Sequence, residues 1–326
     1  MKASVIGASG YAGGELVRLA LGHPDLDLVQ VTSRRHAGGT LGAAHPNLRH
    51  YTDITFTEPD RLETVDVLFT ALPKGESLSL QPRLTRAAAL LVDLGQDFRD
   101  PAGSTDPPFV PGLPELYRAE LAGADRISVP GCMATAATLA IKPLAEAGLV
   151  AGDVIVDART GSSGAGAAPG EATHHAERQH ALRVYRAAGH RHEREVGRMC
   201  GIRARMTVTA VPLVRGVQVI AHIRPSRPVS RAEIWQTYRR HYAGEPFVRL
   251  VARRAGLHRL PDPQFLTGSN FTDIGFDVDD DGERVVVVAA LDNLVKGAAG
   301  GAVQSMNVAT GIPERTGVDF PGLHPV

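Results

Sequence analysis

The chain of 326 residues exceeds one ordinary hydrophobic core, so we expect two domains. Its 35 basic and 35 acidic side chains balance, and no apolar run approaches the roughly 18 residues of a membrane span, so neither nucleic acid nor a membrane is an expected partner. Two cysteines in so long a chain argue against a disulfide framework and favour a reducing compartment, for which the cytoplasm is the expected location.

The first elements predict a dinucleotide-binding turn. An apolar strand over residues 3–6 runs into Gly7, Gly10 and Gly13, and a helix is expected over residues 11–21. Glycine lets the backbone approach a pyrophosphate, and the helix N-terminus supplies N–H donors. The spacing departs from the commoner G-x-G-x-x-G, and many turns carry three glycines. The position between a strand and a helix favours the nucleotide interpretation.

The end of the second expected strand, residues 27–32, indicates which nucleotide is bound. A sequence that prefers NAD usually places an acidic residue here to bind the ribose 2′-hydroxyl. This chain instead has Ser33, Arg34 and Arg35, a hydroxyl and two guanidinium groups that suit a 2′-phosphate. We therefore predict NADP(H) as the cofactor, with two solvated surface arginines as the alternative.

Two further loops follow buried strands, which are expected over residues 66–71 and 90–93. Ligands bind at the carboxyl ends of strands in doubly wound sheets, so both loops are candidate binding sites. The second loop contains Arg99, which could clamp a phosphate. An ion pair of Arg99 with Asp97 or Asp100 is the alternative.

The strand-to-helix turn at Cys132 is the candidate catalytic element. A short strand over residues 126–129 is ended by Pro130 and Gly131, and an Ala/Leu-rich helix is expected to run to about residue 148. Cys132 therefore lies in or just before the first helical turn, where N–H groups and the helix dipole favour thiolate over thiol. The thiolate is the nucleophile. A small buried cysteine is the alternative.

The composition changes after residue 149. A strand over residues 153–159 is expected to lead into a flexible loop of small side chains, residues 160–166. A basic block over residues 174–205 follows, with eight arginines and five histidines against three glutamates. His190 and His192 lie within this block.

The remaining elements predict an α+β second domain, because long antiparallel strands with few helices differ from the first half. The turn of one hairpin has three aspartates but lacks the terminal Glu of a calcium loop, so we expect no metal there. The expected elements are a hairpin over residues 206–214 and 217–224, a helix over 231–241, a hairpin over 272–277 and 284–290, and a helix over 300–310.

A nucleotide-binding half, a thiol at a helix start and a histidine pair together predict covalent redox catalysis. A thiolate can displace phosphate from an acyl phosphate to give a thioester, which hydride from a nicotinamide then reduces. His190 and His192 can carry the proton, because the pKa of histidine lies near working pH. Only folding can bring them to Cys132. A zinc site, which His-x-His and one cysteine leave underdetermined, and exposed histidines in an arginine-rich loop are alternatives.

Seven motifs follow one another along the chain: Gly7-x-x-Gly-Tyr-x-Gly13, Val92-Asp-Leu-Gly-Gln-Asp-Phe-Arg99, Gly112-Leu-Pro-Glu115, Pro130-Gly-Cys132, Gly161-Ser-Ser-Gly-Ala-Gly166, Gly189-His-Arg-His192 and Asp292-Asn-Leu-Val-Lys-Gly-Ala-Ala299. Together they resemble the N-acetyl-γ-glutamyl-phosphate reductase family, which is related to aspartate-semialdehyde dehydrogenase and, more distantly, to glyceraldehyde-3-phosphate dehydrogenase. The resemblance covers nearly the whole chain and is far more specific than any single motif. It implies reduction of a γ- or δ-acyl phosphate by NADPH to a semialdehyde, with release of phosphate.

The resemblance also implies a fold and residue roles. It implies an α/β, Rossmann-type doubly wound domain over residues 1–131 and 298–326, and an α+β substrate and dimerisation domain over residues 132–297. It implies that Cys132 is the nucleophile and that the His190/His192 pair supplies the acid and base, with His192 favoured. Arg99 and Glu195 are the implied substrate contacts. The implied cofactor contacts are Gly7, Ser9, Gly10, Tyr11, Gly13, Ser33, Arg34, Pro73, Ser163, Gly164 and Asn293, the last placed to hold the nicotinamide amide.

The chain departs from the usual family pattern after the cysteine, where Met133 and Ala134 replace Tyr and Pro. Together with His174-His175-x-Glu177-Arg178 and a fuller set of arginines around Tyr185, this resembles the branch that works in lysine biosynthesis. In that branch an aminoadipyl phosphate is attached through its amino group to a small acidic carrier protein. A basic block on an otherwise neutral protein suits such a partner by steering and ion pairing.

Several alternatives stay open at this point. The substrate could be the N-acetylated glutamyl phosphate of arginine biosynthesis, or a carrier-linked glutamyl analogue. The basic block could be a solvated face or a cover over the active site. A regulator that senses NADP without turnover is an alternative of another class. The small-residue helix and long hairpins favour a homodimer or homotetramer.

Overall fold

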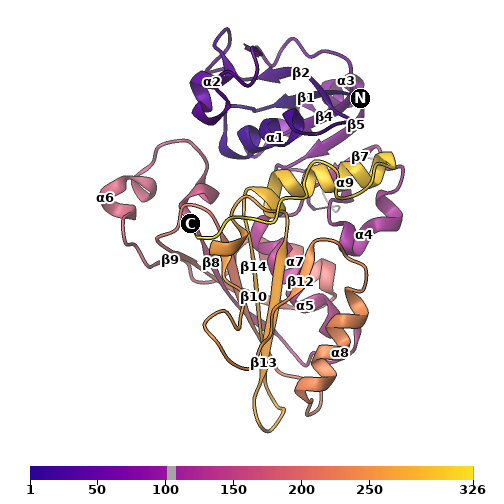
Figure 1. Ribbon diagram of the computed structural model, residues 1–326, viewed down its shortest axis with the longest axis vertical. Coiled ribbons are helices and arrows are strands. Elements are labelled where there is room, and N and C mark those ends of the chain that lie inside the picture. Colours follow the sequence, from indigo (N-terminus) through magenta and orange to yellow (C-terminus); the bar gives the residue numbers. More distant parts are fainter. Residues whose placement is uncertain (101–107, 326) are drawn as a thin grey trace. The chain divides into compact units, whose positions relative to one another are not determined.

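The computed structural model describes residues 1–100 and 108–325 in two compact units (Figure 1). The first unit joins Met1–Pro130 to Ala298–Asp319, and the second joins Gly131–Gly297 to the chain from Phe320 onward. The sequence places this C-terminal tail in the first domain. It belongs to the second unit because the ring of His324 lies 5.2 Å from the ring of Phe265.

The first unit is built on a seven-stranded sheet in the order β3-β2-β1-β4-β5-β7-β6, with every pair parallel. The chain leaves the centre of this sheet in both directions, so right-handed crossovers place α1 and α3 on opposite faces. This is the doubly wound sheet that the sequence predicts. The elements are β1 (Lys2–Ile6), α1 (Tyr11–Leu21), β2 (Asp27–Thr32), α2 (Leu41–Ala44), η1 (Pro46–Leu48), β3 (Phe56–Thr57), β4 (Val65–Thr70), α3 (Glu76–Ala87), β5 (Ala88–Asp93), β6 (Val110–Pro111), α4 (Pro114–Leu121), β7 (Arg126–Ser128) and α9 (Gly300–Thr310).

Apolar side chains on alternate strand positions form the core beneath α3. Leu84 of this helix packs with Ile6, Leu68 and Leu91 from three neighbouring strands. Because successive side chains of a strand face opposite ways, the residues between them face the other layer of helices. The near-continuous apolar strands of this unit are what a sheet covered on both faces requires.

The second unit contains a mixed sheet of seven strands in the order β12-β13-β14-β11-β8-β10-β9. The pairs β8–β10 and β12–β13 are parallel, and the other four are antiparallel. The elements are α5 (Cys132–Glu146), β8 (Val154–Thr160), η3 (Ser162–Ala165), η4 (Glu171–Thr173), α6 (His175–Arg178), β9 (Arg183–Arg186), α7 (His192–Cys200), β10 (Ala204–Ala210), β11 (Val217–Ile223), α8 (Arg231–His241), β12 (Val248–Leu250), η5 (Pro263–Leu266), β13 (Thr272–Val278), β14 (Val285–Leu291) and the π-helix η6 (Val295–Ala299).

The predicted hairpin over residues 206–214 and 217–224 is wrong, although both strands exist as β10 and β11. β8 lies between them, parallel to β10 and antiparallel to β11. The connecting segment crosses the end of β8, where Gly161 N donates to Gly216 O at 2.9 Å and Ser162 N donates to Leu213 O at 2.8 Å. A turn signal marks a reversal of the chain but does not say which strand the chain returns beside. The other predicted hairpin is confirmed as β13 and β14.

The segment expected to be a flexible loop, residues 160–166, contains the short helix η3, which the same crossing segment holds in place. The basic block is also more ordered than its composition suggests, because it forms α6, β9 and α7. Helix α7 is rich in charge, and its buried face consists of His192, Glu195, Val196, Met199 and Cys200. Two of these five are polar, so apolar periodicity is a weak signal there.

Helix α5 is the buried helix of the second unit and contacts β11, β14, α7 and α8. The hydroxyl of Tyr238 donates to the carbonyl of Ala140, and that of Tyr242 donates to Leu139 O at 2.5 Å. These contacts anchor the helix whose first residue is Cys132. None of the helices in the described part of the chain combines the length and apolar character that crossing a membrane requires.

Candidate active site

The turn after β1 has the close backbone packing that a dinucleotide requires. Gly7 has a φ of 79°, and a Cβ at Gly13 would lie 2.2 Å from the Gly7 carbonyl oxygen, so α1 starts directly against the turn. At Gly10 the nearest atom to such a Cβ is 3.7 Å away, which leaves room for a ligand. Tyr11, the first residue of α1, is 48% exposed. The turn fits a pyrophosphate at a helix N-terminus.

The end of β2 fits the ribose part of the same ligand. The hydroxyls of Ser9 and Ser33 are 2.8 Å apart and join the glycine turn to β2. The side chain of Arg34 is 64% exposed, and its Nη1 lies 3.3 Å from an oxygen of Glu76. An exposed ion pair of this kind contributes little to stability, so the guanidinium can turn to a 2′-phosphate.

The loops after β4 and β5 hold the other predicted residues of this unit. Pro73 is exposed in the first loop. In the second, Arg99 Nη2 donates to Leu94 O at 2.8 Å, which folds the arginine onto its own loop. The carboxylate of Asp97 accepts a hydrogen bond of 2.8 Å from Gly75 N and so stabilises the start of α3. The role of Arg99 as a phosphate clamp stays a prediction.

Cys132 is the first residue of α5, as predicted, and Gly131 is its N-cap. A Cβ at Gly131 would lie 2.1 Å from Nε2 of His192, so glycine is what lets this imidazole reach the start of the helix. Gly297 also packs closely against the cysteine, because a Cβ at Gly297 would lie 2.5 Å from the Cβ of Cys132. The helix dipole and first-turn N–H groups favour the thiolate here. Burial instead raises the pKa of Cys200 to about 12, which makes that thiol inert.

The two histidines are buried, with His190 7% and His192 1% exposed, so the alternative of exposed loop histidines is wrong. The backbone N of His192 donates to Nδ1 of His190 at 3.2 Å, and the ring centroids are 4.5 Å apart. That bond needs an unprotonated Nδ1. Burial, followed by the charges of Arg191 and Arg186, lowers the pKa of His190 to about 4. His190 is therefore neutral near pH 7, with its proton on Nε2.

A buried carboxylate connects Cys132 with His192. Oε2 of Glu195 accepts a hydrogen bond of 2.8 Å from the backbone N of Gly131. Oε1 of the same carboxylate lies 3.8 Å from Nε2 of His192, one turn away on α7. A carboxylate at this place favours the protonated imidazole. The predicted substrate contact of Glu195 stays a prediction.

Cys132, His190 and His192 line one cavity of about 490 Å³. Tyr185 lies in the same wall. Its pKa is raised by burial and, second, by the charge of Cys132, which indicates that the phenol and the sulfur are neighbours. The cavity therefore brings together a thiol at the start of α5, a phenol of β9, and two imidazoles at the start of α7 and just before it.

Three arginines of the basic block, Arg178, Arg183 and Arg191, line this cavity. Among the residues that the structure describes, no acidic side chain lines it. A surplus of positive charge beside a thiolate fits an anionic substrate. Part of the basic block is thus a wall of the candidate active site, in agreement with the alternative that this segment covers it.

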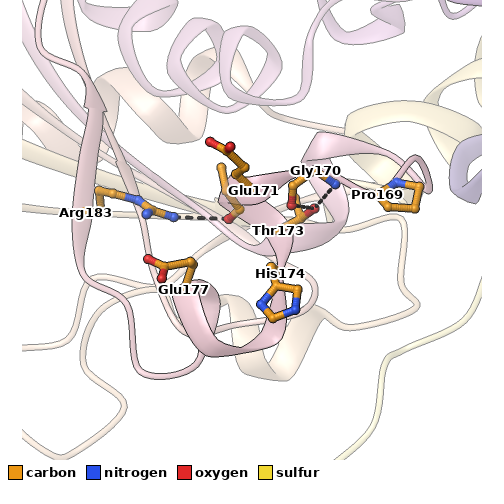
Figure 2. Close-up of a pocket in the computed structure, with 8 residues that line it drawn as sticks. Pro169, Gly170, Glu171, Thr173, His174, Glu177 and Arg183 are labelled. Atoms are coloured by element: carbon orange, nitrogen blue, oxygen red, sulfur yellow. Dashed lines mark hydrogen bonds between the residues drawn. The ribbon is translucent and has the colours of Figure 1, made fainter.

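An open pocket of about 800 Å³ adjoins the catalytic cavity (Figure 2). The two share Ala172, Thr173 and Arg183 in their linings. Nη2 of Arg183 donates to Ala172 O at 3.1 Å, and Figure 2 shows this side chain reaching toward the turn that contains Glu171. The catalytic cavity and this open pocket are therefore neighbours that share part of their lining.

Three predicted cofactor residues meet in the second unit. Nδ2 of Asn293 donates to the hydroxyl of Ser163 at 2.9 Å, and Gly216 N donates to Oδ1 of Asn293 at 2.7 Å. Gly164 follows Ser163 in η3 and lines the catalytic cavity. Asn293 thus holds Ser163, which lies between the lining residues Ser162 and Gly164. Contact of these residues with a nicotinamide stays a prediction.

The predicted site residues fall into two groups, one in each unit. Sequence reasoning missed the close approaches at Gly131 and Gly297, although a glycine directly before a reactive cysteine is a signal for such an approach. The first group lies at the carboxyl ends of β1, β2, β4 and β5: Gly7, Ser9, Gly10, Tyr11, Gly13, Ser33, Arg34, Pro73 and Arg99. The second surrounds the catalytic cavity: Cys132, Ser163, Gly164, His190, His192, Glu195 and Asn293.

The fold and both sites belong to a known class of protein. Residues 2–124 match the NAD-binding domain of semialdehyde dehydrogenase, and residues 132–293 match its dimerisation domain. Aspartate semialdehyde dehydrogenase II from Vibrio cholerae, complexed with ASA, has the same fold, with a TM-score of 0.72 at 16% identity over 94% of this chain and 97% of that chain. The Candida albicans enzyme, solved with NADP, matches with a TM-score of 0.68 at 16% identity over 94% of this chain and 97% of that chain. The chain belongs to the semialdehyde dehydrogenase family.

Relatives of higher identity narrow this class. A protein from Deinococcus radiodurans named LysW-L-2-aminoadipate 6-phosphate reductase is 43% identical over 99% of this chain and 97% of its own length. A relative from Thermomicrobium roseum with the corresponding name is 45% identical over 99% of both chains. The predicted resemblance to the acyl-phosphate reductases, the Rossmann-type fold with a second domain, and the assignment as an oxidoreductase with an NAD(P)-binding domain are therefore confirmed.

Proposed function

We propose that the chain reduces an α-aminoadipyl phosphate, attached through its amino group to a small acidic carrier protein, to the semialdehyde with release of phosphate, in lysine biosynthesis. The observation that carries this proposal is the cavity in which Cys132 lies at a helix start with His190 and His192, in a wall that contains three arginines. The names of the relatives support the carrier-linked substrate. A relative from Haloarcula marismortui, 45% identical, is named for the LysW-linked glutamate phosphate as well, so the glutamyl analogue is a second candidate.

In this mechanism Cys132 is the nucleophile. Its thiolate forms a bond to the acyl carbon while the bond from that carbon to the phosphate oxygen breaks, and phosphate leaves with the bonding electrons. The N–H groups at the start of α5 can stabilise the oxyanion of the addition step. When bound, NADPH supplies the hydride that reduces the resulting thioester. The carbon–sulfur bond of the thiohemiacetal on Cys132 then breaks as the hydroxyl proton returns to His192, which releases the aldehyde and restores the thiolate.

His192 is the residue that carries the proton. It accepts the thiol proton when the thiolate forms, and Glu195, 3.8 Å from its Nε2, stabilises the imidazolium. The imidazolium then donates to the oxyanion that reduction leaves on the former carbonyl oxygen. His190 is a poor acid at neutral pH, because its lowered pKa keeps it neutral. Its role is to hold His192 through the hydrogen bond from His192 N.

NADP(H) is the proposed cofactor. The glycine turn of Gly7, Gly10 and Gly13 fits the pyrophosphate, and Ser33 with Arg34 fits the 2′-phosphate. A reduced nicotinamide donor and a reactive thiol both belong in a reducing compartment, so the cytoplasm is the proposed location.

The reverse reaction tests this proposal. With carrier-linked semialdehyde, NADP and phosphate, the protein should produce NADPH, and Cys132→Ser should not. After incubation with the acyl phosphate, mass spectrometry should find the acyl group on Cys132. A regulator that binds NADP without turnover would bind the nucleotide and leave Cys132 unlabelled. Equal kcat/KM on N-acetylglutamyl phosphate would reject the carrier-linked substrate in favour of the arginine-pathway reaction.

Strand β9 is the proposed docking edge for the carrier. It lies at the end of its sheet, and its side chains alternate between the cavity and the outside. Arg183 and Tyr185 line the cavity, whereas Val184 is 54% exposed and Leu182, directly before the strand, is 76% exposed. An apolar edge next to a basic cavity wall suits an acidic partner that must place its attached substrate inside.

A substitution that introduces one negative charge next to β9 tests the docking edge. Leu182→Glu should raise KM for the carrier-linked substrate by about tenfold, through lost apolar contact and repulsion of an acidic partner, and should leave the N-acetylated substrate within about twofold. Leu257→Glu is the matched control, because Leu257 is 90% exposed elsewhere on the same unit. Equal losses on both substrates for Leu182→Glu would place β9 outside the docking surface.

A homodimer through the second unit is also proposed. Helices α5, α7 and α8 lie against one face of its sheet, and Val154, Val156 and Ala158 of β8 are buried. Ile155 lies between Val154 and Val156 in this strand, so its side chain is on the opposite face of the sheet, where it is 49% exposed. Residues 132–293 of this unit match a dimerisation domain, which supports the pairing of two copies of the chain through that face. Ile155→Glu should shift the mass in sedimentation toward the monomer, and an unchanged mass would exclude this face.

A further inference from the structure

The imidazole of His45 lies against the glycine turn that follows β1. Its Nε2 is 2.7 Å from the carbonyl oxygen of Ala8, and because a carbonyl oxygen only accepts, Nε2 carries the proton and donates it. The ring also packs on α1, since a Cβ at Gly14 would lie 2.3 Å from Cε1 and 2.6 Å from Nδ1 of His45. Glycine at position 14 is therefore what lets the imidazole reach Ala8.

The backbone of His45 is held on both sides. Its N donates to Leu41 O at 2.9 Å, and its carbonyl oxygen accepts from Leu48 N at 2.9 Å, so this residue joins α2 to η1. Leu41 and Leu48 are both buried. A side chain on a fixed backbone loses less conformational entropy when it forms a hydrogen bond. The contact of His45 with Ala8 is therefore preorganised.

This hydrogen bond sets the direction of the next N–H group of the turn. The peptide bond between Ala8 and Ser9 is trans, so the N–H of Ser9 points opposite to the Ala8 carbonyl and away from His45. Ala8 N donates to Thr32 O at 3.1 Å, whereas Ser9 N makes no hydrogen bond within the part of the chain that the structure describes. The N–H of Ser9 is thus a donor that a pyrophosphate at the start of α1 can use.

We propose that His45 is a positioning residue for the cofactor, because its bond to Ala8 O aims the N–H of Ser9 at the pyrophosphate of NADP(H). This inference rests on the proposed cofactor and adds to it a residue outside the glycine turn that fixes the orientation of the turn. His45 acts through the peptide and needs no contact with the nucleotide. Its loss should therefore weaken cofactor binding and leave kcat at saturating cofactor nearly unchanged.

Calorimetric titration of the full chain with NADPH tests the proposal without requiring turnover. Adenosine 2′-monophosphate is the second probe, because it carries the 2′-phosphate but no pyrophosphate. His45→Ala should raise the Kd of NADPH by about tenfold, through loss of one hydrogen bond and of the fixed direction of the Ser9 N–H. The Kd of adenosine 2′-monophosphate should stay within about twofold. In the NADPH assay, KM for the cofactor should rise while kcat stays within about twofold.

Two further variants separate the hydrogen bond from the presence of a histidine. His45→Gln should restore most of the affinity for NADPH, since the glutamine amide can donate to Ala8 O. His50→Asn is the matched control. His50 is exposed in the same connection between β2 and β3 and has a φ of 59°, which asparagine tolerates. It should change the affinity for neither probe.

Gly14→Ala displaces the imidazole without removing it. The three atoms nearest to a Cβ at Gly14 all belong to the His45 ring, and alanine is a better helix former than glycine, so α1 itself is not weakened. Gly14→Ala should therefore raise the Kd of NADPH about as much as His45→Ala does. In the double variant the ring is absent, so adding Gly14→Ala to His45→Ala should cause no further loss.

Unchanged Kd of NADPH in both His45→Ala and Gly14→Ala would overturn the proposal. Equal losses on the two probes would overturn it too, because His45 would then act on the ribose end or on the fold rather than on the pyrophosphate donor. If His45→Ala loses its thermal transition, His45→Gln and Gly14→Ala decide, since the first should bind NADPH nearly normally and the second should not. Failure of the proposed reaction would appear separately, as absent NADPH formation by an unmodified protein that still binds the cofactor.

Discussion

The nucleotide-binding turn and the catalytic cavity are built in opposite ways. The turn consists of contiguous backbone, in which Gly13 packs against Gly7 within one strand-to-helix connection. The cavity consists of side chains from distant segments, in which His192 of α7 lies against Gly131 at the start of α5. Ligand binding at the turn depends on backbone donors, whereas chemistry in the cavity depends on the placement and protonation of a few side chains. Substitutions should therefore have graded effects at the turn and much larger ones in the cavity.

The largest effect is expected at the sulfur. Cys132→Ser should lower kcat by ~10⁴-fold or more, because a hydroxyl without a lowered pKa is a poor nucleophile. Cys200→Ser tests the comparison with the other thiol, which is buried and inert. Cys200→Ser should retain turnover in the NADPH assay. Similar activity of the two variants would show that the reaction does not pass through Cys132.

The second largest effect separates the two histidines. His192→Gln should lower kcat by ~10²–10⁴-fold, the contribution typical of a general acid–base group. His190→Gln should lower kcat by less than about tenfold, because glutamine can still accept the hydrogen bond that His190 Nδ1 receives from His192 N. Both are measured in the same NADPH assay at saturating substrate. A greater loss in His190→Gln would transfer the acid–base role to His190.

The third prediction concerns a substitution in the backbone next to the cavity that keeps Cys132, His190 and His192 in place in the sequence. Gly131→Ala places a Cβ 2.1 Å from Nε2 of His192, so the imidazole or the helix start must move. Misplacement of this size should lower kcat by ~10–100-fold. Gly22→Ala is the control, since its Cβ would have no atom closer than 3.7 Å. Equal activity of Gly131→Ala and the unmodified protein would show that His192 need not contact this residue.

The same contrast explains what the sequence could predict. Local apolar periods, glycine turns and helix ends predicted the positions of three helices and of five strands of the first sheet: α1, α8, α9, β1, β2, β4, β5 and β7. The short strands β3 and β6 carry too few residues for such a period. The position of β8 between β10 and β11 was not, because strand order depends on non-local hydrogen bonds that no turn signal encodes. Cys132 and the histidine pair could be found from residue type. Their burial, the lowered pKa of His190 and the contacts of Glu195 exist only in the folded chain.

The fourth prediction tests the turn, where a graded effect is expected. Arg34→Glu should raise KM for NADPH by about tenfold, because a carboxylate replaces a cation that suits the 2′-phosphate. The substitution should reduce or reverse the preference for NADPH over NADH, while kcat at saturating cofactor changes little. Arg49→Glu is the control, an exposed arginine of the same unit. An unchanged ratio of kcat/KM for the two cofactors would mean that Arg34 is a solvated surface arginine.

The smallest expected effect concerns stability and returns to the cavity. The pKa of His190 is lowered from 6.5 to about 4, first by burial and then by Arg191 and Arg186. Between these values the unfolded chain binds a proton that the folded chain does not, so the free energy of unfolding falls as the pH drops through this range. His190→Gln removes this contribution. When the pH is lowered from about 7 to about 5, the melting temperature of both proteins should fall. The fall should be a few degrees smaller for His190→Gln than for the unmodified protein.

The difference between the two proteins in the slope of melting temperature against pH reports on His190 alone. Burial also lowers the pKa values of His23 and His241, but these groups are present in both proteins and cancel in the difference. Calorimetry at several pH values measures both slopes. Equal slopes would mean that His190 takes up its proton in the folded protein as easily as in the unfolded one. The assignment of the proton to His192 rather than to His190 would then lose its electrostatic basis.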